Sequence, residues 1–159
     1  MIIPIRIADA NIAFEEDILK TIGLGSCVAV TLFDRERKIG GMIHFMLPSK
    51  MFSKAFFNPY KYCDTGLSNL IMQMEQFGSR KYRMEAKLIG GANMFPVFIK
   101  NKEESIGFRN VDMAKKILRE NRIPVIAEDT GSDYSRSVEF TVKTGIIKIT
   151  SYKMGEIQY

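Results

Sequence analysis

Two apolar runs joined by a short charged segment constrain the fold of this chain more than any other feature. Val28 to Phe33 is rich in β-branched and aromatic residues, Asp34 to Lys38 is charged, and Ile39 to Leu47 is apolar again. This pattern predicts a β-hairpin. Both faces of the hairpin are apolar, so its strands need a covering layer on each side. We therefore predict a layered α/β domain whose mixed or antiparallel central strands are covered by helices.

The turn of this hairpin decides whether Cys27 and His44 share a face of the sheet. A turn of two or four residues centred on Glu36 and Arg37 pairs Ala29 with His44. In that register Cys27 and His44 are diagonal neighbours, about 7 to 8 Å apart at the backbone and within reach of a long side chain. A loop of three or five residues would send the two side chains to opposite faces.

Cys27 and His44 are candidates for nucleophilic catalysis. His44 is the only histidine of the chain. A thiol of ordinary pKa, about 8.5, is mostly unionised at neutral pH, and a neighbouring imidazole is the usual way to activate it. Gly23 and Gly25 permit backbone conformations in which amide N–H groups near the sulfur converge on an oxyanion. Two structural alternatives stay open: a cysteine packed as a small hydrophobe, and a histidine that is only a satisfied polar group. A phosphate-binding loop is disfavoured, because no third glycine or helix follows.

The rest of the chain alternates strand and helix patterns without repeats or linkers, so residues 1–159 are predicted to form a single domain. Helices are predicted from about Asp64 to Phe77 and from about Asn110 to Glu120. Cys63 lies in helical step with the apolar residues of the first helix, which indicates core packing. The further predicted strands are Ile2 to Ala8, Glu85 to Ile89, Ile123 to Glu128, Ser137 to Val142 and Ile146 to Tyr152.

Several classes of function are disfavoured by composition. No apolar run approaches the roughly 18 residues that a membrane helix needs, and the N-terminus lacks a signal-peptide pattern. We therefore expect a cytoplasmic protein without membrane insertion. One histidine and two cysteines in different contexts suit neither a disulfide framework nor a zinc site, and no metal or other cofactor is expected. The net charge of +5 suggests an acidic partner.

Short motifs in a fixed order along most of the chain carry a family resemblance. Together they span about residues 20 to 142 and resemble the signature blocks of the CheD family, the chemoreceptor glutamine deamidases. Ordered blocks are far more specific than any one motif. They are Thr21-Ile22-Gly23-Leu24-Gly25-Ser26-Cys27 with Gly41-Met42-Ile43-His44-Phe45, then Lys61-Tyr62-Cys63-Asp64, Lys87-Leu88-Ile89-Gly90-Gly91-Ala92-Asn93-Met94-Phe95, Ile106-Gly107-Phe108-Arg109-Asn110, and Ala127-Glu128-Asp129-Thr130-Gly131 with Arg136-Ser137-Val138-Glu139.

This resemblance implies an α/β layered domain, similar in site design to the deamidating necrotising toxins of bacteria. It implies a hydrolase of protein glutamine side chains in which Cys27 is the nucleophile, His44 the general base and Thr21 the group that orients the imidazole. It also implies chemoreceptors as substrates and a CheC-type phosphatase as a docking partner. The alternative function is a non-catalytic chemotaxis adaptor that regulates such a phosphatase.

Further polar residues of the matching blocks are expected to support loops rather than to line the site. These residues are Asn93, Asn110, Glu128, Asp129 and Arg136.

The segment from Ser49 to Lys61 interleaves basic and aromatic residues, including Lys54, Phe56 and Phe57. Such a pattern suits either the stacking of single-stranded nucleic acid or the binding of an amphipathic helix. Alternatively, its aromatic side chains fold back onto the core. The resemblance favours helix binding, because the family acts on long cytoplasmic helices, and we predict no nucleic-acid partner.

Overall fold

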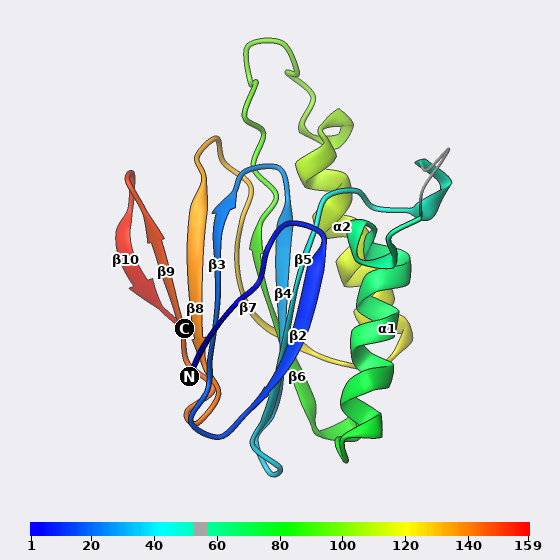
Figure 1. The fold of residues 1–159 in the computed structure, drawn as a ribbon. Helices are drawn as coiled ribbons and strands as arrows, with labels where there is room; N and C mark the ends of the chain where they lie inside the picture. Colours follow the sequence, from blue (N-terminus) through cyan, green and yellow to red (C-terminus); the bar gives the residue numbers. More distant parts are fainter. Residues whose placement is uncertain (53–56) are drawn as a thin grey trace.

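Two five-stranded sheets and two α-helices make up the fold in a computed structural model, which describes residues 1–52 and 57–159. The helices, one sheet and the other sheet form three successive layers (Figure 1). One sheet has the order β2-β5-β4-β6-β7 and the other the order β1-β3-β8-β9-β10. The elements are β1 (Ile2–Pro4), β2 (Asp9–Phe14), β3 (Ile18–Leu24), β4 (Val28–Asp34), β5 (Ile39–Phe45), α1 (Cys63–Gln76), β6 (Met84–Gly90), α2 (Ile106–Glu120), β7 (Val125–Thr130), β8 (Arg136–Thr141), β9 (Ile147–Ser151) and β10 (Gly155–Gln158).

The predicted hairpin is the centre of the molecule. Every residue of β4 and β5 is buried. Val28, Val30 and Leu32 pack into the core beneath α1 and α2, whereas Ala29 and Phe33 pack into the core between the two sheets. The expectation of a layered α/β fold with covered central strands is confirmed. Helices cover one face of these strands, and the second sheet covers the other.

The register of the hairpin also agrees with the prediction. Ala29 pairs with His44, and Asp34 pairs with Ile39, which leaves a four-residue connection from Arg35 to Lys38. A four-residue turn is one of the two lengths that place Cys27 and His44 on the same face, and the observed pairing has that register.

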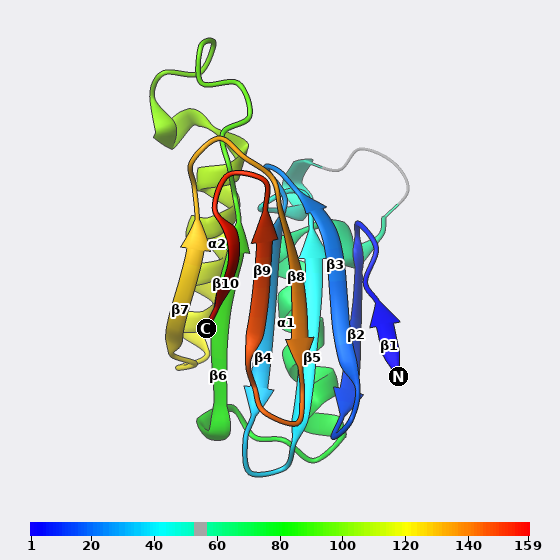
Figure 2. The same cartoon turned by 90° about the vertical axis from the view of Figure 1, so that its left-hand side faces the viewer.

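The second sheet was only partly foreseen. β1 ends at Pro4, four residues before the end of the predicted N-terminal strand. The chain then enters the sheet that contains the central hairpin, where β2 pairs with β5 (Figure 2). β3 pairs with β1 and β8, and β10 extends the sheet beyond β9. The sequence analysis did not identify β2, β3 or β10 as separate strands, because β2 and β3 lack a clean alternation and β10 has only four residues.

The predicted helices are present with small shifts of their ends. α1 begins at Cys63, which is fully buried, as its helical step indicated. α2 begins at Ile106, before the predicted Asn110, because the Ser105 side chain accepts a hydrogen bond from the backbone N–H of Phe108, at 3.2 Å, and so caps the helix. In the described residues, no helix has both the length and the apolar character that crossing a membrane requires.

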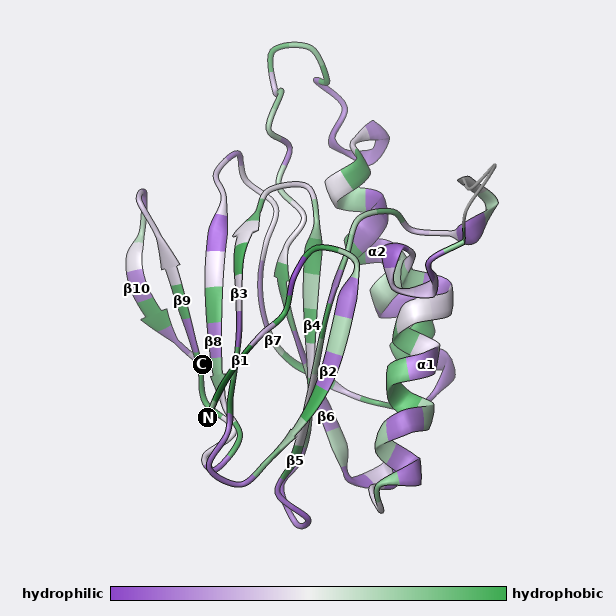
Figure 3. Cartoon of the chain, in the orientation of Figure 1, coloured by the Kyte–Doolittle hydropathy of each residue, from purple (hydrophilic) through white to green (hydrophobic). Residues whose placement is uncertain are grey.

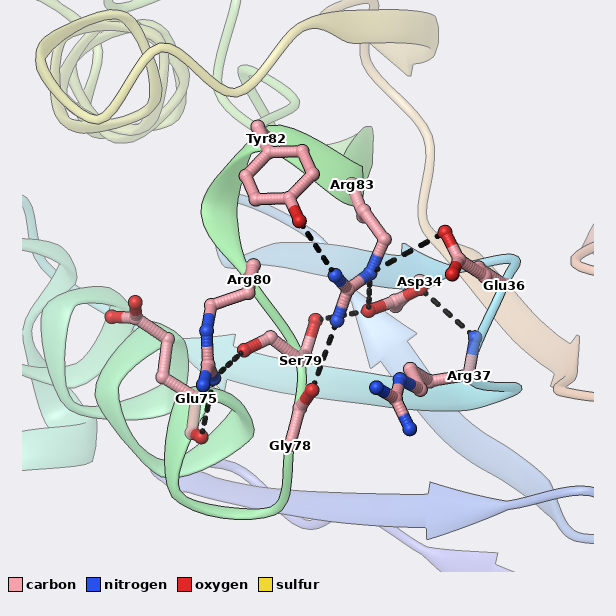
Figure 4. A network of polar contacts seen from close by, with 9 residues as sticks. All are labelled: Asp34, Glu36, Arg37, Glu75, Gly78, Ser79, Arg80, Tyr82 and Arg83. Carbon is pink, nitrogen blue, oxygen red and sulfur yellow. Dashed lines mark hydrogen bonds and ion pairs between the residues drawn. The ribbon is translucent and has the colours of Figure 1, made fainter.

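A polar network fastens the closed end of the hairpin to the end of α1 (Figure 4). The buried Asp34 carboxylate accepts a hydrogen bond from Ser79 at 2.6 Å and from Arg83 at 3.1 Å. Burial raises the pKa of Asp34, but these hydrogen bonds, with one from the backbone N–H of Arg37, outweigh it and lower the pKa below its ordinary value. Figure 3 shows this hydrophilic end of the molecule opposite the hydrophobic loop that follows β6.

Candidate active site

His44 lies between the two sheets, on the same face of β5 as Met42, which packs into the core between them. Its side chain is fully buried. The hydroxyl oxygen of Thr21, on β3 of the other sheet, lies 2.8 Å from His44 Nδ1. The structure therefore brings two of the three predicted site residues together through direct contact between the sheets.

The Thr21 hydroxyl fixes the tautomer of the imidazole. A hydroxyl has a single hydrogen to donate, and Thr21 Oγ1 donates it to the backbone oxygen of Ile5 at 2.7 Å. The contact with His44 must then run the other way, with Nδ1–H donating to Thr21 Oγ1. In a neutral imidazole this leaves the lone pair on Nε2, which has no hydrogen-bond partner among the described residues. His44 is thus presented as a base at Nε2.

The Ile5 carbonyl is a part of the site that sequence reasoning missed. It lies just after β1, where the backbone N–H of Ile5 donates to Lys20 at 2.7 Å and so ties this residue to β3. A backbone oxygen leaves no signal in residue identity, so only the strand pairing of β1 with β3 could have revealed it.

Cys27 is half-buried and packs against the core cluster between the two sheets, which also holds Ala29 and Met42. It therefore lies on the side of β4 that His44 faces. The turn before it follows an irregularity in the β3–β8 ladder between Thr21 and Leu24, where Gly23 adopts a φ of 71°. Gly23 supplies a backbone conformation that side-chain-bearing residues rarely adopt.

The backbone around Cys27 is anchored by the end of β6. The N–H of Gly91 donates to the Cys27 carbonyl and the N–H of Ala92 to the Gly25 carbonyl, both at 2.9 Å. Gly90 has a φ of 109°, and a β-carbon there would collide with the Cys27 carbonyl oxygen. Of the amide N–H groups near the sulfur, that of Gly25 donates to the Gly23 carbonyl at 3.1 Å and so does not face an oxyanion.

Burial keeps both reacting groups neutral at rest. Burial raises the pKa of Cys27 above its ordinary value, although a hydrogen bond from its own backbone N–H acts in the opposite sense. Burial lowers the pKa of His44 from 6.5 to about 4. At pH 7 Cys27 is therefore a thiol and His44 a free base, and no hydrogen bond joins His44 Nε2 to Cys27 in the described residues.

A small cavity of about 150 Å³ adjoins Ser26, the residue before Cys27. Ser26 lines it, together with residues of the loop that follows β6, among them Asn93, Met94 and Phe95. Phe95 and Phe98 of this loop are 64% and 84% exposed. A larger groove of about 600 Å³ is lined by residues 4–7 and by Lys20, Thr21 and Ile22.

The other polar residues of the matching blocks make contacts that support the fold, although Asn93 also lines the cavity at Ser26 and Asn110 bonds the segments of the site. Asn93 Nδ2 donates to the Ile99 carbonyl at 2.8 Å, and the buried Arg136 guanidinium pairs with Asp129 at 3.1 Å. Glu128 pairs with Lys115 at 3.0 Å. Asn110 instead reaches the segments that carry Cys27 and His44.

The structure describes the segment from Ser49 to Lys61 except for residues 53–56. Phe57 is 49% exposed and stacks on the buried Tyr62, with ring centroids 6.0 Å apart. It is therefore neither fully in the core nor free of it. Lys54 and Phe56, on which the docking prediction also depends, lie outside the described residues.

No group of three or more His, Cys, Asp or Glu side chains within residues 1–52 and 57–159 is arranged to hold a metal ion. The site brings together the Ile5 carbonyl, the Thr21 hydroxyl and an oriented imidazole, with Cys27 on the same side of the hairpin as His44.

The chain is similar to known proteins over nearly its whole length. A family model described as CheD chemotactic sensory transduction matches residues 46–151. A chemoreceptor glutamine deamidase CheD of Halalkalibacterium halodurans is 41% identical over 156 residues, which cover 98% of this chain and 96% of the relative. The protein of that name from Bacillus subtilis is 41% identical over 157 residues, covering 98% and 95%. A crystal structure of a Neisseria meningitidis protein of the DUF152 family has a TM-score of 0.50 at 15% identity, over 84% of this chain and 64% of that one. That likeness concerns the fold alone, whereas the sequence matches extend over nearly the whole chain and lead to one conclusion: the chain belongs to the CheD family.

Proposed function

We propose that this protein hydrolyses the side-chain amide of specific glutamines in the cytoplasmic helices of chemoreceptors, converting them to glutamate in chemotactic adaptation. As a CheD-family protein the chain is an amidohydrolase, and its relatives are named for this substrate. The observation that carries the proposal is the Ile5–Thr21–His44 relay, which leaves the imidazole lone pair on Nε2. A merely structural histidine needs no such arrangement.

The first half of the reaction forms a thioester. His44 Nε2 takes the proton of the Cys27 thiol as the sulfur attacks the carboxamide carbon of the glutamine. The resulting imidazolium gives that proton to the nitrogen of the tetrahedral intermediate. The carbon–nitrogen bond then breaks and ammonia leaves.

The second half restores the enzyme. Nε2 takes a proton from water while the water oxygen attacks the thioester carbon. The carbon–sulfur bond breaks, and the proton returns to the Cys27 sulfur. The sum is glutamine plus water giving glutamate plus ammonia, with no redox step and no cofactor.

Thr21 supports both halves by holding the ring through Nδ1. Because the hydroxyl accepts from Nδ1–H, it also stabilises the imidazolium that forms in each half. The role resembles that of the third group in other nucleophilic triads.

The proposal extends to a CheC-type phosphatase as a docking partner. The support is the family relationship together with the exposed Phe95 and Phe98 beside the site. A protein that worked only by docking, as an adaptor, would bind receptor or phosphatase without changing the receptor's mass.

The test is to incubate purified receptor fragments with the protein and to map their glutamines by mass spectrometry. We expect conversion of particular glutamines to glutamate, and its loss in Cys27→Ser and in His44→Ala, with circular dichroism unchanged. Serine is a far weaker nucleophile without thiolate character, and no second histidine is available. Wild-type turnover in folded Cys27→Ser would refute the covalent mechanism.

A further inference from the structure

We propose that Asn110 of α2 is a positioning residue that fixes the Cys27 segment against the strand that carries His44. This inference rests on the proposed function of those two residues. Asn110 is fully buried. Its Nδ2 donates to the Ser26 carbonyl at 3.0 Å and to the Met46 carbonyl at 2.9 Å.

These two carbonyls lie just beyond the end of the central ladder. The last β4–β5 pair is Val28 with Phe45. Ser26 immediately precedes Cys27, and Met46 lies two residues after His44. The two hydrogens of one side-chain amide thus join the segments where backbone pairing has ended, so Asn110 limits how far the nucleophile and the base can separate.

Asn110 also completes the anchoring of the turn at Cys27. The carbonyls of Gly25 and Cys27 accept from backbone N–H groups at the end of β6. The Ser26 carbonyl between them is held by a side chain, and that side chain comes from a different layer of the fold. Its loss would free the one peptide group that connects Ser26 to the nucleophile.

The helix that carries Asn110 is itself fixed against this turn. A β-carbon on Gly107 would collide with the carbonyl oxygens of Gly91 and Ala92. The N–H groups of Gly91 and Ala92 donate to the turn at Cys27. The close packing of Gly107 on these two residues therefore fixes the first turn of α2 relative to that turn. Asn110 therefore acts from a rigid base.

The Asn110 side chain serves as a hydrogen-bond donor through its NH2 group. Asn110 Oδ1 is buried and has no hydrogen-bond partner among the described residues. An unsatisfied buried acceptor is unfavourable for stability. A polar side chain placed there at that cost is explained by the two carbonyls that it holds.

The test compares Asn110→Leu with the same substitution at Asn121. Leucine keeps the approximate volume and removes both hydrogen bonds. Asn121, at the other end of α2, also donates from Nδ2 to a backbone carbonyl, that of Ile117 at 2.8 Å, but far along the chain from the site residues. We expect Asn110→Leu to lower kcat on receptor fragments by about 10- to 100-fold, with KM within about twofold of the parent. Asn121→Leu should leave both constants unchanged.

Alkylation separates loss of positioning from general loosening. In Asn110→Leu the labelling of Cys27 by iodoacetamide at pH 7 should be slower than in the parent, because Nε2 is no longer held where it can take the thiol proton as the sulfur attacks. The buried Cys63 should stay unlabelled over the same time. Unchanged kcat, or labelling of Cys63 as fast as Cys27, would overturn the proposal.

A second variant, Asn110→Asp, covers the case in which the leucine variant does not fold. A carboxylate cannot donate, whereas a protonated carboxyl donates one hydrogen bond. We expect low turnover at pH 7 that rises, relative to the parent, as the pH is lowered to 5. Parental turnover at pH 7 would overturn the positioning role. The proposed function would fail independently, if the parent converted no receptor glutamine or if Cys27→Ser kept its activity.

Discussion

At the scale of single residues, the chemistry depends on where one hydrogen of Thr21 points. Because that hydrogen is donated to Ile5, the imidazole of His44 must donate from Nδ1, and its basic nitrogen faces away from the second sheet's hydroxyl. Substitution of Thr21 and the pH dependence of kcat/KM test this arrangement.

Replacing Thr21 by valine keeps the shape and removes the relay. The Ile5 carbonyl and His44 Nδ1 both lose their partner, so the ring loses its fixed tautomer and orientation. We expect kcat for deamidation to fall about 10- to 100-fold in Thr21→Val, while Thr21→Ser keeps most of it. Steady-state kinetics on a receptor fragment would measure both. Equal activity of the valine and serine variants would show that the hydroxyl is not used.

The pH dependence should reflect a buried base. Burial lowers the pKa of His44 to about 4, so Nε2 stays unprotonated through the weakly acidic range, and burial raises the pKa of the Cys27 thiol. We expect kcat/KM to be nearly flat from pH 7 to pH 5 and to fall only as the pH approaches 4. An acid limb with a midpoint near 6.5 would mean that His44 titrates as an exposed histidine.

At the scale of elements, the site is built where strands end. Cys27 precedes β4, the β6 end bonds its backbone, and α2 reaches it through Asn110. Gly90 ends β6 and Gly91 follows it, and at both positions a β-carbon would meet backbone oxygens, of Cys27 and Gly107 respectively, so side chains are excluded there.

Gly90 and Gly78 form a matched pair for testing this closeness. Their φ values are 109° and 106°, but a β-carbon at Gly78 meets nothing within 4 Å, whereas one at Gly90 meets the Cys27 carbonyl. Gly78→Ala should cost about 1 to 3 kcal/mol of unfolding free energy from backbone strain alone and spare activity. Gly90→Ala should cost more and also lower kcat. If both variants lost the same stability and neither lost activity, the packing of β6 on Cys27 would be unimportant.

How far the sequence predicted these elements depended on local pattern. The central hairpin and both helices have strong periodicity, and the pairing of Ala29 with His44 followed from turn length. The contact of Thr21 with His44 needed the family resemblance, because it joins two sheets whose pairing leaves no local signal. The hydrogen bond from Thr21 to the Ile5 carbonyl and the two from Asn110 were not predicted, because they depend on the pairing of β1 with β3 and on how α2 packs on the central sheet.

At the scale of the whole molecule, the two ends have different tasks. Cys27 lies at the end of the central sheet where β4 begins and β6 ends, and the network around Asp34 lies at the opposite end, beside the β4–β5 turn (Figure 1). That network joins the β4–β5 turn to the segment after α1, and it shares no residue with the site. We infer that it stabilises the fold without a part in the reaction.

Two serine-to-alanine variants test this separation. Ser79 is fully buried and donates to Asp34, whereas the exposed Ser68 donates to the Asp64 carbonyl within α1. Ser79→Ala should lower the free energy of unfolding by about 1 to 3 kcal/mol, because it leaves a buried carboxylate without one of its donors. Ser68→Ala should change it by less than about 0.5 kcal/mol. Urea denaturation would measure both, and a loss of kcat in folded Ser79→Ala would contradict the separation.

The proposed mechanism requires a covalent bond between Cys27 and its substrate. The most direct measurement is acid quenching of the protein during turnover of a glutamine-bearing receptor peptide, followed by intact-mass and peptide mapping. The account predicts an adduct on Cys27 equal to the peptide minus ammonia, absent in Cys27→Ser, that accumulates before glutamate product reaches its steady rate. Turnover without any adduct on Cys27, or an adduct on Cys63 instead, would contradict it.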